Sequence, residues 1–351
     1  MKIGLYGYEG AGASTLFNAL TGLKVATGYG GEKEKIHIGT VKVPDPRIDI
    51  LTDLYKPKKT VFAELVFSDF PARSKDAVKG KALSNVSEAK AVDILALVIK
   101  SFSDEFTEKE VNAASELESL LTEMILVDLE QIEKYLERQA KVAKKDPLII
   151  STLERMVPHL SDGLSLRTFE LTIEETVAMR GFSFLSIKKA IAAINVNEGD
   201  TGNELPANLA QVAEKHGVKP FLLSAAIEEE ISTMPPEDQE MFLQDLGLSE
   251  PLSARFIRAA YELSDLISFF TVGPDEVRSW PIGRNTSAKR AAGAIHSDLE
   301  KGFIRAEVFH YDDIIAVKGV EAELKKLGKL RLEGKEYPVK DGDILNIRFN
   351  V

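Results

Sequence analysis

Residues 2–22 read KIGLYGYEGAGASTLFNALTG, and this stretch decides the fold. The segment 2–6 is short and apolar, as expected of a buried strand, and a glycine-rich turn follows it from Gly7 to Gly12. Residues 14–20 then show helical spacing, and Gly22 marks the end of that helix. A strand, a glycine loop and a helix in this order predict an α/β domain whose first helix begins at an anion site.

The glycine loop is close to a phosphate-binding motif, G-x-x-x-x-G-K-[ST]. Residues 7–14 read GYEGAGAS, so Gly7, Gly12 and Ser14 occupy motif positions, whereas Ala13 stands where the motif has lysine. The backbone amides and the helix dipole still favour an anion, but the missing cation is expected to weaken binding and, more strongly, hydrolysis. Glu9 adds a negative charge to the same loop. Taken alone, the pattern is equally typical of an ordinary glycine turn between a strand and a helix.

The next part of the chain alternates between predicted strands and helices. Four more apolar runs read as short buried strands, at 63–69, 92–99, 190–195 and 221–224. The near-continuous run at 92–99 is typical of a central parallel strand, and residues 205–216 look helical. This alternation predicts a doubly wound α/β sheet. Residues 23–60 read as loop-rich, with a turn at Pro44-Asp45-Pro46.

Two regions depart from this alternation. Between residues 110 and 159, six mostly apolar positions recur at 4-3-4-3-4 spacing, which predicts a coiled-coil-like hairpin broken at Asp146-Pro147. The seam consists of Ile125, Leu129, Ile132, Leu136, Gln139 and Ala143. After Phe269, strand-like runs at 306–311, 336–340 and 344–351 surround helical stretches near 286–300 and 319–328. We expect a compact α+β domain there.

Composition excludes several classes of protein. The 351 residues contain no cysteine, which excludes disulfides, a thiolate nucleophile and cysteine-ligated metals. The five histidines show no close ligand spacing, and a net charge of −11 argues against a general polyanion binder. No run of 18 apolar residues and no secretory signal is recognisable, so we expect a cytoplasmic protein without a membrane span.

Several segments together resemble the YchF / Obg-like ATPase family. They are Gly7 to Thr15, VKVPDPRIDILTDLYKPKKT (41–60), Asp69, Asn195 to Glu198, Ser224 to Ala226 and the tail from Phe269 to Val351. The resemblance implies a doubly wound P-loop NTPase sheet, an inserted α-helical coiled-coil hairpin and a C-terminal β-grasp domain of the ubiquitin-like TGS type. The implied boundaries are 1–109 and 181–268 for the P-loop domain, 110–180 for the hairpin and 269–351 for the TGS domain.

The resemblance also implies a purine-nucleotide site for ATP or GTP, with ATP usually preferred in the family. The implied nucleotide-binding residues are Gly7, Gly10, Ala11, Gly12, Ala13, Ser14, Thr15, Asn195, Val196, Glu198, Ser224, Ala225 and Ala226. Ser14 and Asp69 would hold Mg²⁺. Residues 195–198 have the form N-x-x-E instead of the guanine-specific N-K-x-D. Asn195 is alternatively an ordinary turn residue at a strand end.

Several positions depart from the family pattern. The D-x-x-G segment is Asp69-Phe70-Pro71-Ala72, only Gly80 represents the glycine-rich second switch, and Lys33 stands at the first-switch threonine position. Together with Ala13, these departures predict weak or lost hydrolysis. A replacement cation could come from one of four residues, although solvated surface charge is the simpler interpretation for all of them. They are Lys33, Lys35, Arg73 and Lys75.

Three functional hypotheses follow. The first, which we favour, is a translation-associated protein that binds a purine nucleotide with weak or lost hydrolysis. The second is a nucleotide-independent adaptor that binds the ribosome or RNA through the hairpin and the tail, and the third is an active ATPase with an unusual cation.

Two sets of charged residues bear on an RNA partner. Lys134, Arg138, Lys141 and Lys145 share one helical face, which fits either an RNA phosphate stripe or ordinary coiled-coil flanking charge. His296, Lys301, Arg305 and Arg331 lie in the tail, and such domains in the family are thought to contact RNA or ribosomal surfaces. His296 fits equally well as a structural histidine. We interpret Trp280, Phe303, Ile304 and Phe349 as core residues of the tail.

Overall fold

The computed structural model describes residues 1–27, 35–71, 86–103, 111–142 and 145–350. The chain divides into two compact units. Unit 1 comprises residues 1–41 and 66–256, and unit 2 comprises residues 42–65 and 257–351. Each unit has its own six-stranded sheet and its own core, and they are described separately.

The sheet of unit 1 has the strand order β2-β4-β1-β5-β6-β7. The strands are β1 (Lys2–Gly7), β2 (His37–Lys42), β4 (Glu64–Asp69), β5 (Ile94–Ser101), β6 (Ala190–Val196) and β7 (Lys219–Leu223). From β4 to β7 every neighbouring pair is parallel. The predicted doubly wound α/β sheet is therefore confirmed, with β1 and β5 at its buried centre.

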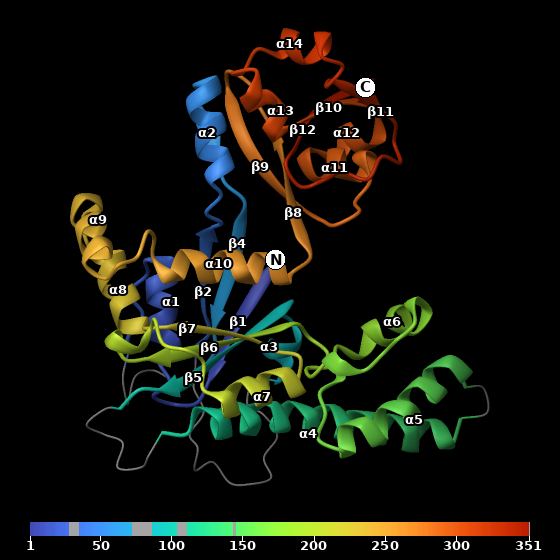
Figure 1. The fold of residues 1–351 in the computed structure, drawn as a ribbon. Helices are drawn as coiled ribbons and strands as arrows, with labels where there is room; N and C mark the ends of the chain where they lie inside the picture. The colour runs from blue at the N-terminus through green and yellow to red at the C-terminus, as the bar shows by residue number, and fades with distance from the viewer. Residues whose placement is uncertain (28–34, 72–85, 104–110, 143–144, 351) are drawn as a thin grey trace. The chain divides into compact units, whose positions relative to one another are not determined.

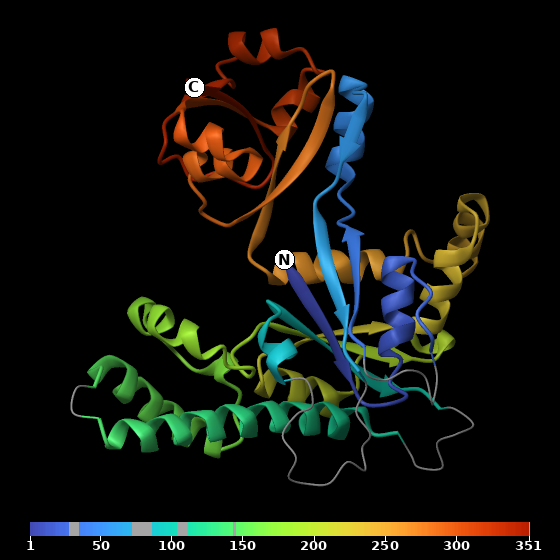
Figure 2. The same ribbon diagram turned by 180° about the vertical axis from the view of Figure 1, so that it is seen from behind.

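Helices cover both faces of this sheet (Figures 1 and 2). On one face lie α1 (Ala13–Thr21) and α8 (Ala225–Thr233), and on the other lie α4 (Ala113–Ala140) and α7 (Ala207–Lys215). Leu97 and Ile99 of β5 and Ile194 of β6 share a core cluster with Leu117 of α4 and Leu209 of α7. Short elements complete unit 1, namely α3 (Val86–Lys90), α9 (Pro236–Asp245) and three 3₁₀ turns.

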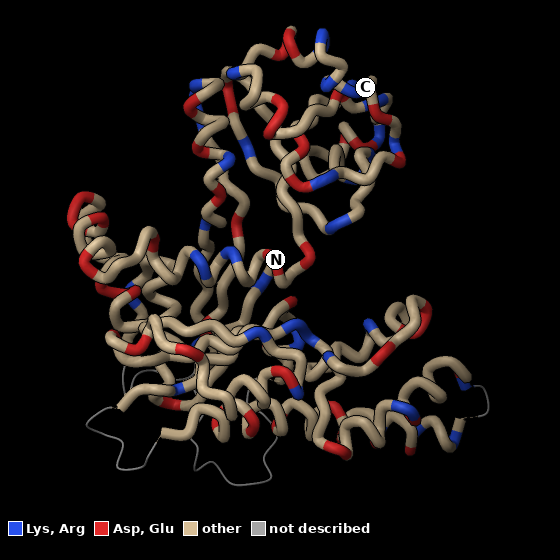
Figure 3. The backbone as a smooth tube through the Cα atoms, in the orientation of Figure 1, with Lys and Arg blue, Asp and Glu red and all other residues tan. Residues whose placement is uncertain are grey.

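The predicted helical insertion is present as α4, α5 (Pro147–Ser161) and α6 (Ile173–Met179). Asp146 caps α5 by accepting the amide of Leu148 at 3.0 Å, so the break at Asp146-Pro147 is a helix start. The seam positions Ile125, Leu129, Ile132 and Leu136 pack in one cluster with α5, as expected. Ala143 lies outside the described residues. Figure 3 shows both signs of charge interspersed along the hairpin, and Lys134 pairs with Glu130 of its own helix.

A buried carboxylate joins α4 to the loop that precedes β6. Asp128 is fully buried on α4, and its two oxygens accept the backbone amides of Leu185 at 2.8 Å and Ser186 at 2.7 Å. Burial raises the pKa of this carboxyl, and the hydrogen bonds with Ser186 and Leu185 oppose the rise. The insertion is thus anchored by one side chain that satisfies two buried donors.

A buried histidine connects α7 with the insertion. His216 Nδ1 lies 2.9 Å from the hydroxyl of Ser165, and its Nε2 lies 3.1 Å from a carboxylate oxygen of Glu118 on α4. The neutral tautomer with its proton on Nε2 satisfies both contacts. Lys215 and Arg167 are the cations that face this ring. Burial lowers the pKa of His216 below its ordinary value, and the nearby Glu118 opposes this only in part.

The lowered pKa of His216 leads to a prediction about the stability of the folded protein in acid. Because the pKa of His216 is lowered in the folded protein, the unfolded chain takes up the proton first, and stability falls as pH drops below about 6.5. We expect His216→Gln to flatten the decline between pH 6.5 and 5.5 by up to about 1 kcal/mol, measured by urea unfolding. The exposed His296→Gln is the control. Parallel pH profiles for the wild-type protein and His216→Gln would contradict the prediction.

The sheet of unit 2 has the order β11-β10-β12-β8-β9-β3. Its strands are β3 (Lys59–Val61), β8 (Leu266–Thr271), β9 (Glu276–Gly283), β10 (Phe303–His310), β11 (Arg331–Glu333) and β12 (Asp343–Phe349). Its helices are α2 (Pro46–Tyr55), α11 (Ala288–Ile295), α12 (Ser297–Lys301), α13 (Tyr311–Ala316) and α14 (Glu321–Lys326), and α10 (Leu252–Leu263) runs from unit 1 into unit 2. The expected C-terminal α+β domain is present.

Residues 42–65 belong to unit 2 although they lie early in the chain. The interpretation of 23–60 as loop-rich is wrong, because this region contains β2, α2 and β3. Asp45 accepts the amide of Arg47 at 3.0 Å and Pro46 occupies the first turn, so Pro44-Asp45-Pro46 is a helix start rather than a simple turn. The boundaries 1–109, 110–180, 181–268 and 269–351 stay predictions; they place residues 42–65 in the first part of the P-loop domain, whereas the division into units groups these residues with unit 2.

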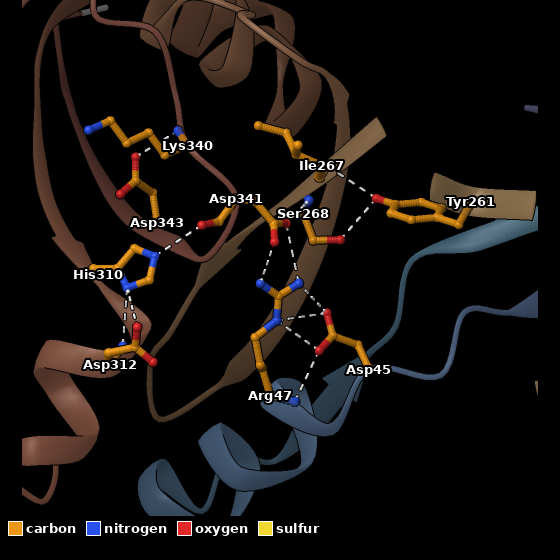
Figure 4. A network of polar contacts seen from close by, with 10 residues as sticks. All are labelled: Asp45, Arg47, Tyr261, Ile267, Ser268, His310, Asp312, Lys340, Asp341 and Asp343. Atoms are coloured by element: carbon orange, nitrogen blue, oxygen red, sulfur yellow. Dashed lines mark hydrogen bonds and ion pairs between the residues drawn. The ribbon is translucent and has the colours of Figure 1, made fainter. Parts of the chain in front are cut away.

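Arg47 holds this early segment on unit 2 (Figure 4). Its guanidinium lies 2.8 Å from both Asp45 and Asp341, and it stacks 5.2 Å from the ring centre of Phe270. Asp341 in turn accepts the amide of Ser268 at 2.9 Å. A planar guanidinium between two carboxylates is a strong and directional contact.

Two details of unit 2 differ from expectation. The predicted strand 336–340 is irregular, with only an isolated bridge from Pro338 to Ser287, because proline cannot donate to a ladder. Trp280 and Phe303 pack against the core as predicted. The prediction was wrong for Ile304 and Phe349, which are 52% and 43% exposed at the end of the β10–β12 pair.

Candidate phosphate-binding site

Two glycines of the loop occupy positions that tolerate no side chain. A Cβ on Gly7 would lie 2.6 Å from the carbonyl oxygen of Val98 on β5. Gly12 has φ +91°, and a Cβ there would lie 2.3 Å from Nδ2 of Asn195. The motif spacing therefore reflects real steric requirements where β1 passes into α1.

The loop presents backbone donors at the start of α1. The amide of Ala11 donates to the carbonyl of Tyr8 at 3.1 Å, which closes the turn. Within the described chain, the other amides of this segment have no backbone acceptor; they belong to Gly10, Gly12, Ala13, Ser14 and Thr15. Such donors at a helix N-terminus favour a bound anion.

Ser14 and Asp69, both predicted as metal ligands, lie together. The Ser14 hydroxyl donates to Asp69 Oδ2 at 2.7 Å, joining α1 to the carboxyl end of β4. Asp69 is 3% exposed, and among the described residues no partner reaches its Oδ1. Burial raises the pKa of Asp69, and the Ser14 hydrogen bond and His37 oppose the rise.

These oxygens fit Mg²⁺, which prefers hydroxyl, carboxylate and phosphate oxygens. An unpartnered buried carboxylate oxygen beside a hydroxyl is the kind of donor set that such an ion completes. In the described part of the chain, no group of three His, Cys, Asp or Glu side chains could hold a metal. An ion here would therefore depend on phosphate oxygens and water for its remaining ligands.

His37 is a neighbour of this pair that the sequence analysis missed. Its Nδ1 lies 3.9 Å from Asp69 Oδ2, and its side chain is 36% exposed. The residue begins β2, which pairs with β4 at the edge of the sheet. Because β2 itself was not predicted, nothing in the sequence placed His37 beside Asp69.

Asn195 connects three predicted segments. It is buried at the end of β6, where its Nδ2 donates to the carbonyl of Ala11 at 3.0 Å and its Oδ1 accepts the amide of Ala225 at 2.9 Å. The side chain thus ties the glycine loop to the start of α8. Its predicted contact with a base remains a prediction, and its observed role is to position the loop.

The two hydrogen bonds of the Asn195 side chain lead to a prediction about Asn195→Asp. The substitution keeps an acceptor for Ala225 but places a carboxylate oxygen against the carbonyl of Ala11, where the wild-type protein has a donor. We expect a loss of about 2–3 kcal/mol in the free energy of unfolding. The nearby exposed Asn197→Asp, measured by urea unfolding at pH 7, is the matched control. Equal stability of the two variants would contradict a positioning role.

The remaining predicted residues lie next to Asn195 and Ala225 in the sequence. Val196 and Ser224 are buried, whereas Glu198 and Ala226 are exposed beside them on the loop after β6 and on α8. Their contacts with a nucleotide stay predictions. Lys35 is exposed before β2. The predictions for Lys33, Ala72, Arg73, Lys75 and Gly80 fall outside the described residues.

A strand–glycine loop–helix unit with a serine and an aspartate on neighbouring elements of a parallel sheet defines the chain as an α/β protein of the P-loop NTPase type. Residues 266–350 match the family model YchF-GTPase_C, described as "Protein of unknown function (DUF933)".

Comparison with known proteins makes the assignment more specific. The chain is 38% identical over 361 residues to the "Ribosome-binding ATPase YchF" of Pasteurella multocida, covering 100% of this chain and 99% of that protein. The Bacillus subtilis protein of the same name is 36% identical over 366 residues, with all of both chains covered. A solved structure, that of the Schizosaccharomyces pombe YchF GTPase, covers 99% of this chain and 97% of its own at a TM-score of 0.85 and 29% identity. The chain belongs to the YchF family.

Proposed function

We propose that the protein binds a purine nucleoside triphosphate, ATP or GTP, at the glycine loop and associates with the ribosome, with slow or absent hydrolysis. One observation above all supports the nucleotide site: Ser14 and Asp69 meet at 2.7 Å beside the amides that begin α1, for which the described residues offer no backbone acceptor. The Pasteurella multocida and Bacillus subtilis relatives carry the name ribosome-binding ATPase, which supports the choice of ligand and partner.

The residues of this chain would act on the triphosphate through binding and orientation. The amides from Gly10 to Thr15 would donate to the phosphate oxygens, and the positive end of α1 would add to their attraction. Ser14 and Asp69 would hold Mg²⁺, which neutralises phosphate charge when it is bound. Asn195 would keep the loop in register with the loops at the ends of β6 and β7 that would contact the base.

Slow hydrolysis follows from what the loop lacks. Ala13 presents a buried methyl group where a lysine would place a cation on the terminal phosphates. Pro71, two residues after Asp69, has no amide to offer a phosphate oxygen. Charge grows on the transferred phosphoryl group in the transition state, so missing donors there slow the reaction more than they weaken binding.

Isothermal calorimetry with ATP and GTP, with and without Mg²⁺, tests the nucleotide site. We expect measurable binding that weakens about tenfold in Ser14→Ala and stays unchanged in Ser119→Ala, an exposed serine on α4. No heat and no thermal shift at millimolar nucleotide would refute the site. That result, together with co-sedimentation with ribosomes, would favour the nucleotide-independent adaptor instead.

A further inference from the structure

Lys100 is a buried lysine that no part of the proposed site has used so far. It lies near the carboxyl end of β5, the strand that pairs with β1 immediately before the glycine loop, and the residue is only 4% exposed. Burying an ammonium is costly, so a buried lysine is a candidate for a functional charge.

The register of the sheet places Lys100 on the same face as the loop. Lys100 pairs with Asn195 across β5 and β6, and paired residues of parallel strands point to the same side. The alternate residues Leu97 and Ile99 point to the opposite face, where they pack against α4 and α7. Asn195 reaches the carbonyl of Ala11, so Lys100 lies on the face of the sheet that carries this contact with the loop.

The ammonium lies at the correct edge of the sheet as well. Its Nζ lies 4.8 Å from the ring centre of Phe102, which follows the last residue of β5. The carboxyl edge of a parallel sheet is where the loops that bind ligands gather. The contact with this aromatic face places the cation at this edge.

We propose that Lys100 supplies, from beneath the glycine loop, the positive charge that Ala13 does not provide, so that the triphosphate is attracted by a cation on β5 in place of one on α1. This inference rests on the proposed nucleotide site. It assigns the charge to a residue outside the loop and outside the four candidates suggested by the sequence. A cation at this position acts through space on the phosphates, so its effect persists without a direct hydrogen bond.

Titration calorimetry with MgATP on the full-length protein tests the inference. We expect Lys100→Met to weaken binding about tenfold or more, because the methionine keeps the apolar stem and loses the charge. Lys100→Arg keeps the charge and is expected to bind within about threefold of wild type. Lys219→Met removes an exposed lysine at the opposite edge of the same sheet and is expected to bind like wild type.

Combining Ala13→Lys with Lys100→Met distinguishes the loss of positive charge from a disturbance of the fold. If Lys100 replaces the missing lysine, Ala13→Lys should increase MgATP affinity more in Lys100→Met than in the wild-type protein, and thermal unfolding should show that all variants are folded. Equal affinity of wild type and Lys100→Met would overturn the role of Lys100 while leaving the nucleotide site intact. An equal gain from Ala13→Lys in the wild-type and Lys100→Met backgrounds would overturn it too. A wild-type protein that binds no ATP would refute the proposed function itself.

Discussion

Ala13→Lys is expected to bind MgATP about thirtyfold more tightly than the wild-type protein. A cation about 4 Å from a phosphate is worth about 4 kcal/mol at an effective dielectric near 20, and fixing a lysine side chain costs up to about 2 kcal/mol of entropy. The remaining ~2 kcal/mol corresponds to a roughly thirtyfold lower Kd. Calorimetry at fixed ionic strength measures it directly.

Turnover should respond much less to the same substitution. Pro71 still replaces an amide donor after Asp69, so we expect phosphate release to rise by less than about tenfold. Ala11→Ser, which adds a neutral polar group to the same loop, controls for simple perturbation. Full recovery of hydrolysis from Ala13→Lys alone would show that the lysine position was the single defect.

Asp128→Ala is expected to lower the free energy of unfolding by about 3–5 kcal/mol. The substitution removes the acceptors of the buried amides of Leu185 and Ser186. Each amide left without an acceptor costs about 1–3 kcal/mol of stability. Urea unfolding at pH 7, followed by circular dichroism, measures the change. The comparison is valid if the variant and the wild-type protein unfold with the same m-value.

Two further variants define the cause. Asp128→Asn retains one acceptor oxygen and should lose about half as much stability, because one amide remains satisfied. Asp162→Ala removes an exposed aspartate at the end of α5 and should change stability by less than about 0.5 kcal/mol. A small loss in Asp128→Ala, similar to that of Asp162→Ala, would contradict the anchoring role of Asp128.

The central sheet and the insertion could be predicted because their residues follow strict periods. The apolar run at 92–99 became β5, and the spacing of Ile125, Leu129 and Ile132 gave the buried seam of α4. The α2 segment was missed because its start, Pro44-Asp45-Pro46, has the composition of a turn. The distinction lies in the capping oxygen of Asp45, which only coordinates reveal.

The candidate site was predictable to a similar extent. Motif spacing identified Ser14, the family resemblance added Asp69, and the two side chains do meet. His37 and Lys100 escaped notice because neither belongs to a local motif. His37 depends on an unpredicted edge strand, and Lys100 depends on the register between β5 and β6, which a single sequence does not specify.

The placement of residues 42–65 has a practical consequence for anyone dissecting the protein. An expression fragment that starts at residue 257 or 269 would lack the edge strand β3, the helix α2 and the guanidinium of Arg47. Phe270 and Val277 pack against Ile48 and Leu51, so such a fragment would expose an apolar surface and should precipitate or bind promiscuously. Fusing residues 42–65 to its N-terminus through a glycine linker would restore α2 and β3, and we expect this fragment to fold on its own.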